Sequence, residues 1–150
     1  MTAEPGKRTF YCPHCGHKLS FLDGTMIKMD GVLESPTFSV RAQFFLPAEL
    51  GRYGAIVAGD VEIRDGARVE FFCSSPRCDA NFTTNYNADL AEIRMVDEHG
   101  REFVVVFNKV YGRRATFVVD WKQRKLVDSF GEHAARYAAT FERSLNYFGA

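Results

Sequence analysis

The sequence lacks the long apolar runs that membrane-spanning segments need. Its longest purely apolar stretch, around 103–107, has only a few residues, so no transmembrane helix is expected. The first eight residues contain no apolar segment of the kind found in secretory signals. We therefore expect a cytoplasmic protein without membrane contact.

An excess of one charge is also missing, because 19 lysines and arginines balance 19 aspartates and glutamates. Proteins that act mainly by neutralising nucleic-acid phosphates usually carry a clear basic excess, so nucleic acid is not the favoured partner. The chain has no glycine-rich phosphate loop, no Gly-x-Ser-x-Gly elbow and no His-Glu-x-x-His motif. The sequence thus gives no positive case for an enzyme, and we expect a non-catalytic protein.

Cysteine is scarce, but the four cysteines of the chain form two close pairs. Thiols in the cytoplasm are kept reduced, so paired cysteines are interpreted first as metal ligands. Four thiolates can close a tetrahedral shell around one zinc ion, and a closed shell is typical of structural rather than catalytic sites. We therefore predict a structural zinc site formed by Cys12, Cys15, Cys73 and Cys78.

The segment Phe-Tyr-Cys-Pro-His-Cys-Gly-His-Lys-Leu at 10–19 resembles the first knuckle of zinc-ribbon proteins. The second knuckle, Phe-Phe-Cys-Ser-Ser-Pro-Arg-Cys at 71–78, has a longer spacing and no glycine directly after Cys78. The insert between the knuckles is also long for a zinc ribbon. The resemblance implies a zinc ion held by two knuckles, and it implies no particular function.

Two other interpretations of the cysteines remain open. Iron in a rubredoxin-like site would use the same ligands. The Cys-Pro-His-Cys motif also resembles the redox motif of thioredoxin-like oxidoreductases, in which the first cysteine lies at a helix N-terminus. No helical periodicity follows the motif here, and the second pair would stay unexplained, so metal binding is favoured.

Most of the chain shows the alternation and turn signals of short strands. A hairpin over 61–71, bending at Asp65-Gly66, leads directly into Cys73. The last three expected strands form an antiparallel meander. Outside the hairpin, the strands that we expect lie at 9–11, 18–22, 25–29, 37–46, 90–96, 102–110 and 115–121.

The period changes near the C-terminal end, where apolar residues recur at steps of three and four from Ala134 to Phe148. Ser129 followed by Glu132 fits a capping box. These signals predict an amphipathic helix over about 130–148 that covers the sheet, with docking onto a partner as the alternative. The expected fold class is α+β and mostly antiparallel β: a zinc ribbon with a long β insert, a β-meander and a C-terminal amphipathic helix.

The expected organisation is a tail over 1–8 and a single domain over 9–150. Within the domain, a zinc-ribbon half with its β insert spans 9–86, and the meander with the terminal helix spans 87–150. The function that these features favour is that of a zinc-stabilised accessory or adaptor protein, which binds another protein.

A local basic excess between 101 and 125 supports an alternative function, nucleic-acid binding. Cations there alternate with aromatic rings, and single-stranded nucleic acids need both, for phosphates and for base stacking. A solvated sheet edge is the simpler interpretation. The candidate nucleic-acid surface consists of Lys109, Arg113, Arg114, Trp121, Lys122, Arg124 and Lys125.

Overall fold

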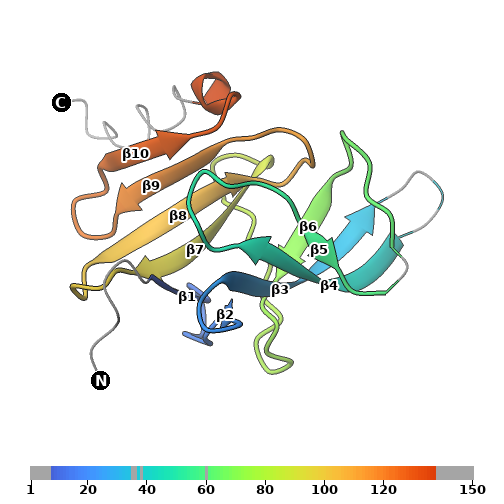
Figure 1. Cartoon of the computed structure of the whole chain (residues 1–150), viewed down its shortest axis with the longest axis horizontal. Helices are drawn as coiled ribbons and strands as arrows, with labels where there is room; N and C mark the ends of the chain where they lie inside the picture. The colour runs from blue at the N-terminus through green and yellow to red at the C-terminus, as the bar shows by residue number, and fades with distance from the viewer. Residues whose placement is uncertain (1–7, 35–36, 38, 60, 138–150) are drawn as a thin grey trace.

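A computed structural model describes residues 8–34, 37, 39–59 and 61–137 of the chain. The strands form two antiparallel five-stranded sheets, which we call sheet A and sheet B (Figure 1). Sheet A has the strand order β1 (Thr9–Tyr11), β7 (Leu90–Val96), β8 (Glu102–Asn108), β9 (Thr116–Asp120) and β10 (Leu126–Phe130). Sheet B contains β2 (Ser20–Phe21), β3 (Met26–Glu34), β4 (Ser39–Pro47), β5 (Ile56–Val57) and β6 (Val69–Phe72).

The two sheets share one main core. Strand β3 alternates strictly, so that Ile27, Met29 and Leu33 are buried while their neighbours are partly exposed. Inward residues of sheet A, such as Ile93 and Val105, join the same cluster. Burial of these alternating apolar faces is what holds the sheets together.

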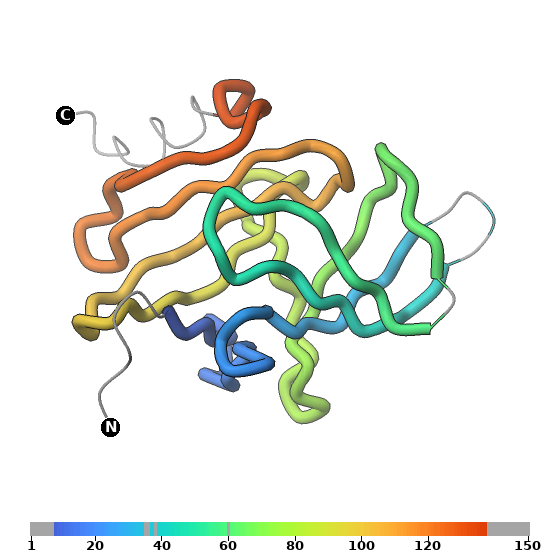
Figure 2. The backbone as a smooth tube through the Cα atoms, viewed as in Figure 1, coloured from blue at the N-terminus to red at the C-terminus, as the bar shows by residue number. Residues whose placement is uncertain are grey.

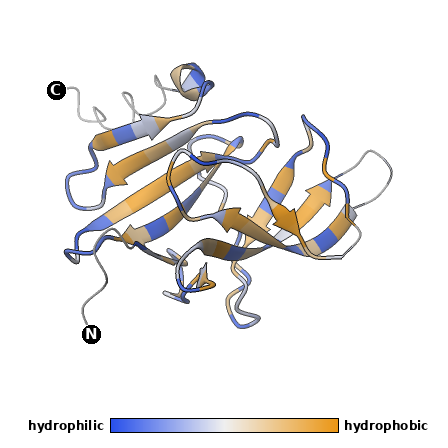
Figure 3. Ribbon diagram, in the orientation of Figure 1, coloured by the Kyte–Doolittle hydropathy of each residue, from blue (hydrophilic) through white to orange (hydrophobic). Residues whose placement is uncertain are grey.

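Strand β8 is buried on both faces, which explains its almost wholly apolar sequence (Figure 3). Val105 faces the main core, whereas Val104 and Val106 belong to a second cluster on the opposite face of sheet A. Tyr137, at the end of a short 3-10 turn (Ala134–Tyr137), packs in that second cluster. The last described turn therefore lies against the outer face of sheet A.

The fold class is nearly all β, so the predicted α+β class is wrong. No helix of seven or more residues occurs in the part of the chain that the structure describes. The expected helix start is wrong because Ser129 and Phe130 pair with β9 as part of β10, a strand that we did not predict. Gly131 then has a φ of 99°, and the carbonyl oxygen of Arg114 would lie 2.2 Å from any Cβ there. The remainder of the predicted helix, 138–148, lies outside the described residues.

Two further sequence expectations need correction. Strand β3 runs to Glu34 rather than stopping at 29, because Gly31 lies against the ring of Phe44 and keeps the pairing with β4 continuous. The predicted hairpin over 61–71 keeps only its second arm, since β6 pairs with β3 instead. No helix in the described ranges is long and apolar enough to cross a membrane.

Candidate metal centre

The two cysteine pairs meet because both are attached to one edge of β3. Strand β2, which follows the first pair, is paired with β3 at Met26 and Ile27. Strand β6, which precedes the second pair, bonds to the same strand from Asp30 to Leu33. Since β4 occupies the other edge, β2 and β6 lie in line, and the loops next to them come together.

The four sulfur atoms have the spacing of a tetrahedral metal site. All four lie within 4.8 Å of one another. The Cys12 and Cys78 sulfurs are 3.8 Å apart, and those of Cys15 and Cys73 are 3.7 Å apart. A zinc–sulfur bond of about 2.3 Å gives tetrahedral sulfur–sulfur edges of about 3.8 Å, so these two separations match and the limit of 4.8 Å is compatible with the other four. They are far too long for disulfides, and all four thiols are free.

The two knuckles have the same backbone hydrogen bonds despite their different lengths. In each, the N–H of the first cysteine donates to the carbonyl two residues after the second cysteine, His17 or Ala80, at 2.8 and 3.0 Å. One step further out, Leu19 N–H donates to Phe10, and Phe82 N–H donates to Phe71. The two extra residues of the second knuckle are therefore contained in its tip and do not disturb its base.

A left-handed residue directly follows each knuckle. Gly16, after Cys15, has a φ of 77°, and Asp79, after Cys78, has a φ of 48°. Aspartate is one of the few non-glycine residues that adopt this conformation readily. Asp79 thus fills the position for which the second knuckle lacks a glycine, and its carboxylate forms an ion pair with Arg41.

Backbone amides point at the sulfur atoms. The N–H groups of His14 and Cys15 donate to Cys12 Sγ at 3.3 and 3.4 Å, and His17 N–H donates to Cys15 Sγ at 3.4 Å. In the second knuckle, Ser75 N–H donates to Cys73 Sγ at 3.5 Å. Such donors favour thiolate over thiol.

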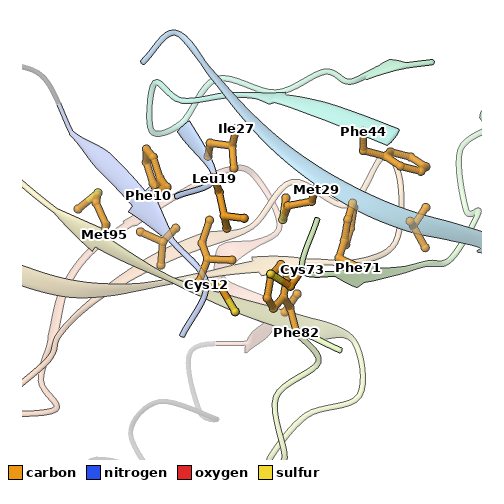
Figure 4. Close-up of a cluster of buried hydrophobic side chains, with 14 of the residues drawn as sticks. Phe10, Cys12, Leu19, Ile27, Met29, Phe44, Phe71, Cys73, Phe82 and Met95 are labelled. Carbon is orange, nitrogen blue, oxygen red and sulfur yellow. The ribbon is translucent and has the colours of Figure 1, made fainter. Parts of the chain in front are cut away.

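Burial and these hydrogen bonds shift the pKa values of the thiols in opposite directions. Cys12 and Cys73 are each 1% exposed and lie in the main core beside Leu19 and Phe82 (Figure 4). Burial raises the pKa of both thiols, whereas the amide of His17 lowers the pKa of the exposed Cys15. Two buried thiolates need a cation, and the four cysteines together could hold one metal ion.

The surroundings do not offer a further ligand among the described residues, because the cysteines form the only group with metal-binding spacing there. His14 and His17 are both exposed, as expected for residues at the tip of a knuckle. Residues 13–15 form a turn rather than a helix, so Cys12 lacks the helix N-terminus of thioredoxin-like redox sites.

The predicted nucleic-acid residues divide into a buried lysine and two groups at the two ends of β9. Lys109 is only 1% exposed in its side chain, and its Nζ donates to Glu70 at 2.5 Å and to Thr83 at 2.7 Å. Arg113 and Arg114 precede β9, and Arg113 pairs with Asp89 at 3.3 Å. The remaining four residues follow β9 and lie in the turn to β10: Trp121, Lys122, Arg124 and Lys125.

Sequence reasoning missed the roles of Asp79 and Glu70. The aspartate could have been found by aligning the two knuckles on their second cysteine, which places it opposite Gly16. Glu70 gave no local signal, because its partners Lys109 and Thr83 lie far along the chain.

Comparisons of the chain with models of protein families, with curated proteins and with solved structures found no match. The interpretation of the four-cysteine site therefore rests on its own geometry.

Proposed function

We propose that the four cysteines bind one zinc ion as a structural centre, in a non-catalytic protein that works by binding another protein. The observation that carries the metal part is the tetrahedral spacing of the four sulfurs. Four thiolates fill the coordination shell of zinc, which leaves no position for a substrate or a reactive water. The ion would join β2 to β6, and its binding energy would contribute directly to folding.

Zinc and iron can be distinguished by visible absorption. An iron–thiolate centre is coloured, whereas a zinc centre is colourless and yields a tetrahedral cobalt–thiolate spectrum when cobalt replaces zinc. We expect a colourless purified protein whose cobalt form shows that spectrum. A coloured, iron-containing preparation would show that the four cysteines bind iron instead of zinc. Absence of the cobalt–thiolate spectrum would refute the site.

The protein-binding part of the proposal is supported by an apolar patch on the outer face of sheet B. Phe21, Leu22 and Ile56 are 40%, 62% and 64% exposed. Phe45 joins them, since its ring centroid lies 5.3 Å from that of Phe21 and it pairs with Ile56 in the β4–β5 register. Contiguous exposed apolar residues of this kind mark interaction sites. The partner that fits is a protein with an apolar surface of its own.

Affinity capture with the full-length protein tests this surface. We expect one stoichiometric protein partner that is lost with Ile56→Ser. The matched control is Val127→Ser, because Val127 is similarly exposed, at 56%, but lies on β10 of sheet A. A partner that both variants retain, or that both lose, would contradict the assignment to sheet B.

Nucleic-acid binding is the second candidate, and the turn between β9 and β10 is what favours it. Lys122, Arg124 and Lys125 are exposed there, and the guanidinium of Arg124 lies 4.9 Å from the centroid of the Trp121 ring. Such a surface would bind single-stranded RNA or DNA with an affinity that falls steeply as salt rises. Absence of binding to single strands at low salt would remove this candidate.

A further inference from the structure

A cavity of about 210 Å³ lies between the two sheets, away from the cysteine site. Its inner wall consists of apolar core residues from both sheets, among them Ile27 and Phe44 from sheet B and Val105 and Phe107 from sheet A. The loop 48–55, drawn in teal, runs across this region from the end of β4 (Figure 2). The cavity is thus a second candidate site, independent of the metal centre.

The loop that borders the cavity is anchored to sheet A. Tyr53 Oη lies 2.9 Å from Thr116 Oγ1, which joins the loop to β9. Gly51 packs on the ring of Phe130, where an added Cβ would come within 2.9 Å of a ring carbon. These contacts fix the loop, so the cavity is a built feature of the fold and not a gap under a loose segment.

The size of the cavity suits a small ligand. An apolar cavity of about 150 Å³ can bind benzene, so this one accommodates a single ring or a short alkyl chain. Ala48, Leu50 and Ile63 add apolar side chains next to the core cluster at its outer part. The body of the ligand is therefore apolar.

The rim of the cavity carries one cation without an ionic partner. Arg52 lies 3.7 Å from Glu49, and Arg113 is paired with Asp89. Arg114 forms no ion pair with any described residue, and its guanidinium lies 5.9 Å from the Tyr53 ring centroid. Arg114 is exposed at the rim, where no described residue neutralises its charge.

Asn108 and Asp65 are among the other polar residues of the lining. Asn108 lines the cavity, and its Nδ2 is buried without a hydrogen-bond partner among the described residues. Asp65, the other free charge at the rim, packs against the backbone of Gly112. The arginine without an ionic partner favours a ligand with acceptor oxygens.

We propose that this cavity binds a small apolar monocarboxylate, with its ring or alkyl body between the sheets and its carboxylate on Arg114. The carboxylate supplies acceptor oxygens and a negative charge to the guanidinium of Arg114, which has no ionic partner among the described residues. The proposal needs neither the metal nor a protein partner, so it stands or fails separately from them.

Three probes with eight carbon atoms each test the proposal by calorimetric titration of the full-length protein: octanoate, octanol and octylamine. We expect octanoate to bind about tenfold more tightly than octanol, as for one charge-assisted contact, and octylamine to bind most weakly. Absence of binding by all three, or equal binding, would overturn the proposal.

Variants locate the site. Arg114→Gln should remove the preference for octanoate and leave octanol binding unchanged, whereas Arg52→Gln, a matched control at the same rim, should keep it. Ala48→Phe should weaken all three probes by filling the cavity. If Ala48→Phe does not fold, the two arginine variants decide, and a preference that survives Arg114→Gln refutes the head-group assignment.

Discussion

At the scale of single residues, the conformation of two positions decides how each knuckle closes. Gly16 and Asp79 both take the left-handed backbone directly after the second cysteine of a pair. This turns the chain back, so that the carbonyl of the next residue can accept from the first cysteine. Two different residues thus serve the same purpose, and the carboxylate of Asp79 also pairs with Arg41.

Gly16→Ala should cost stability and metal affinity together. An added Cβ would meet no atom within 4 Å, so the expected loss of about 1–2 kcal/mol comes from the left-handed backbone alone. Thermal unfolding and metal-competition titration measure the two effects.

Gly66→Ala is the matched control for this substitution. Gly66 has a φ of 90° and equally open surroundings, but it lies in the turn before β6, outside both knuckles. It should lose similar stability and keep its metal affinity. Unchanged metal affinity in Gly16→Ala would show that the left-handed turn does not shape the site.

At the scale of elements, close packing between β3 and β4 depends on a missing side chain. A Cβ on Gly31 would lie 2.5 Å from a ring carbon of Phe44, and Phe44 is buried. Gly31→Ala should therefore overpack the core and lower the free energy of unfolding by about 1–3 kcal/mol in denaturant titrations.

A second substitution separates overpacking from other causes. Phe44→Leu removes ring atoms, so the double variant should be more stable than the sum of the two single losses predicts. Additive losses would mean that the contact between Gly31 and Phe44 does not limit the packing.

The strands were predictable where local alternation decides the structure. The expected strand at 9–11 and the meander strands from 90 to 121 agree with β1, β7, β8 and β9 to within two residues. Long-range contacts explain the failures. The sequence around Gly31 indicates a turn, but in the structure Gly31 packs against the ring of Phe44 inside a strand. Strand β10 forms by pairing with β9. The turn at Asp65-Gly66 is present, but β3 rather than residues 61–64 pairs with β6.

The ligands of the candidate site could be predicted from the sequence, but the residues that position them could not. Spacing alone grouped the four cysteines, and the structure brings them together. In the basic segment, the sequence did not predict that Lys109 is buried, because its partners Glu70 and Thr83 are distant in the chain. The other basic residues of the candidate surface lie at the two ends of β9.

At the scale of the whole molecule, a partly buried ion pair joins the two sheets. Lys109, which follows β8 of sheet A, donates to Glu70 on β6 of sheet B. Burial by itself would raise the pKa of Glu70, but the hydrogen bonds from Lys109 and Thr83 outweigh it and hold the pKa below the ordinary value. The ionised carboxylate therefore stabilises the fold near neutral pH.

Glu70→Gln should lower the free energy of unfolding by about 1–3 kcal/mol near neutral pH, the scale of a hydrogen bond to a charged group. Because the pKa of Glu70 is depressed in the folded state, its contribution is complete above the ordinary value of 4.5 and is lost as pH falls through the folded-state pKa. The difference between wild type and variant should thus shrink below that pH. Denaturant titrations over a pH series measure it, and a constant difference would contradict the linkage.

The four-cysteine cluster is the second connection across the molecule, since the first knuckle links β1 of sheet A to β2 of sheet B and the second knuckle follows β6. Elemental analysis of the purified full-length protein, alongside Cys73→Ser, tests the central claim most directly. The account predicts one zinc ion per chain in the wild type, and in the variant a loss of the ion together with a lower melting temperature. A wild-type protein without bound metal, or a variant that keeps both its metal and its stability, would contradict it.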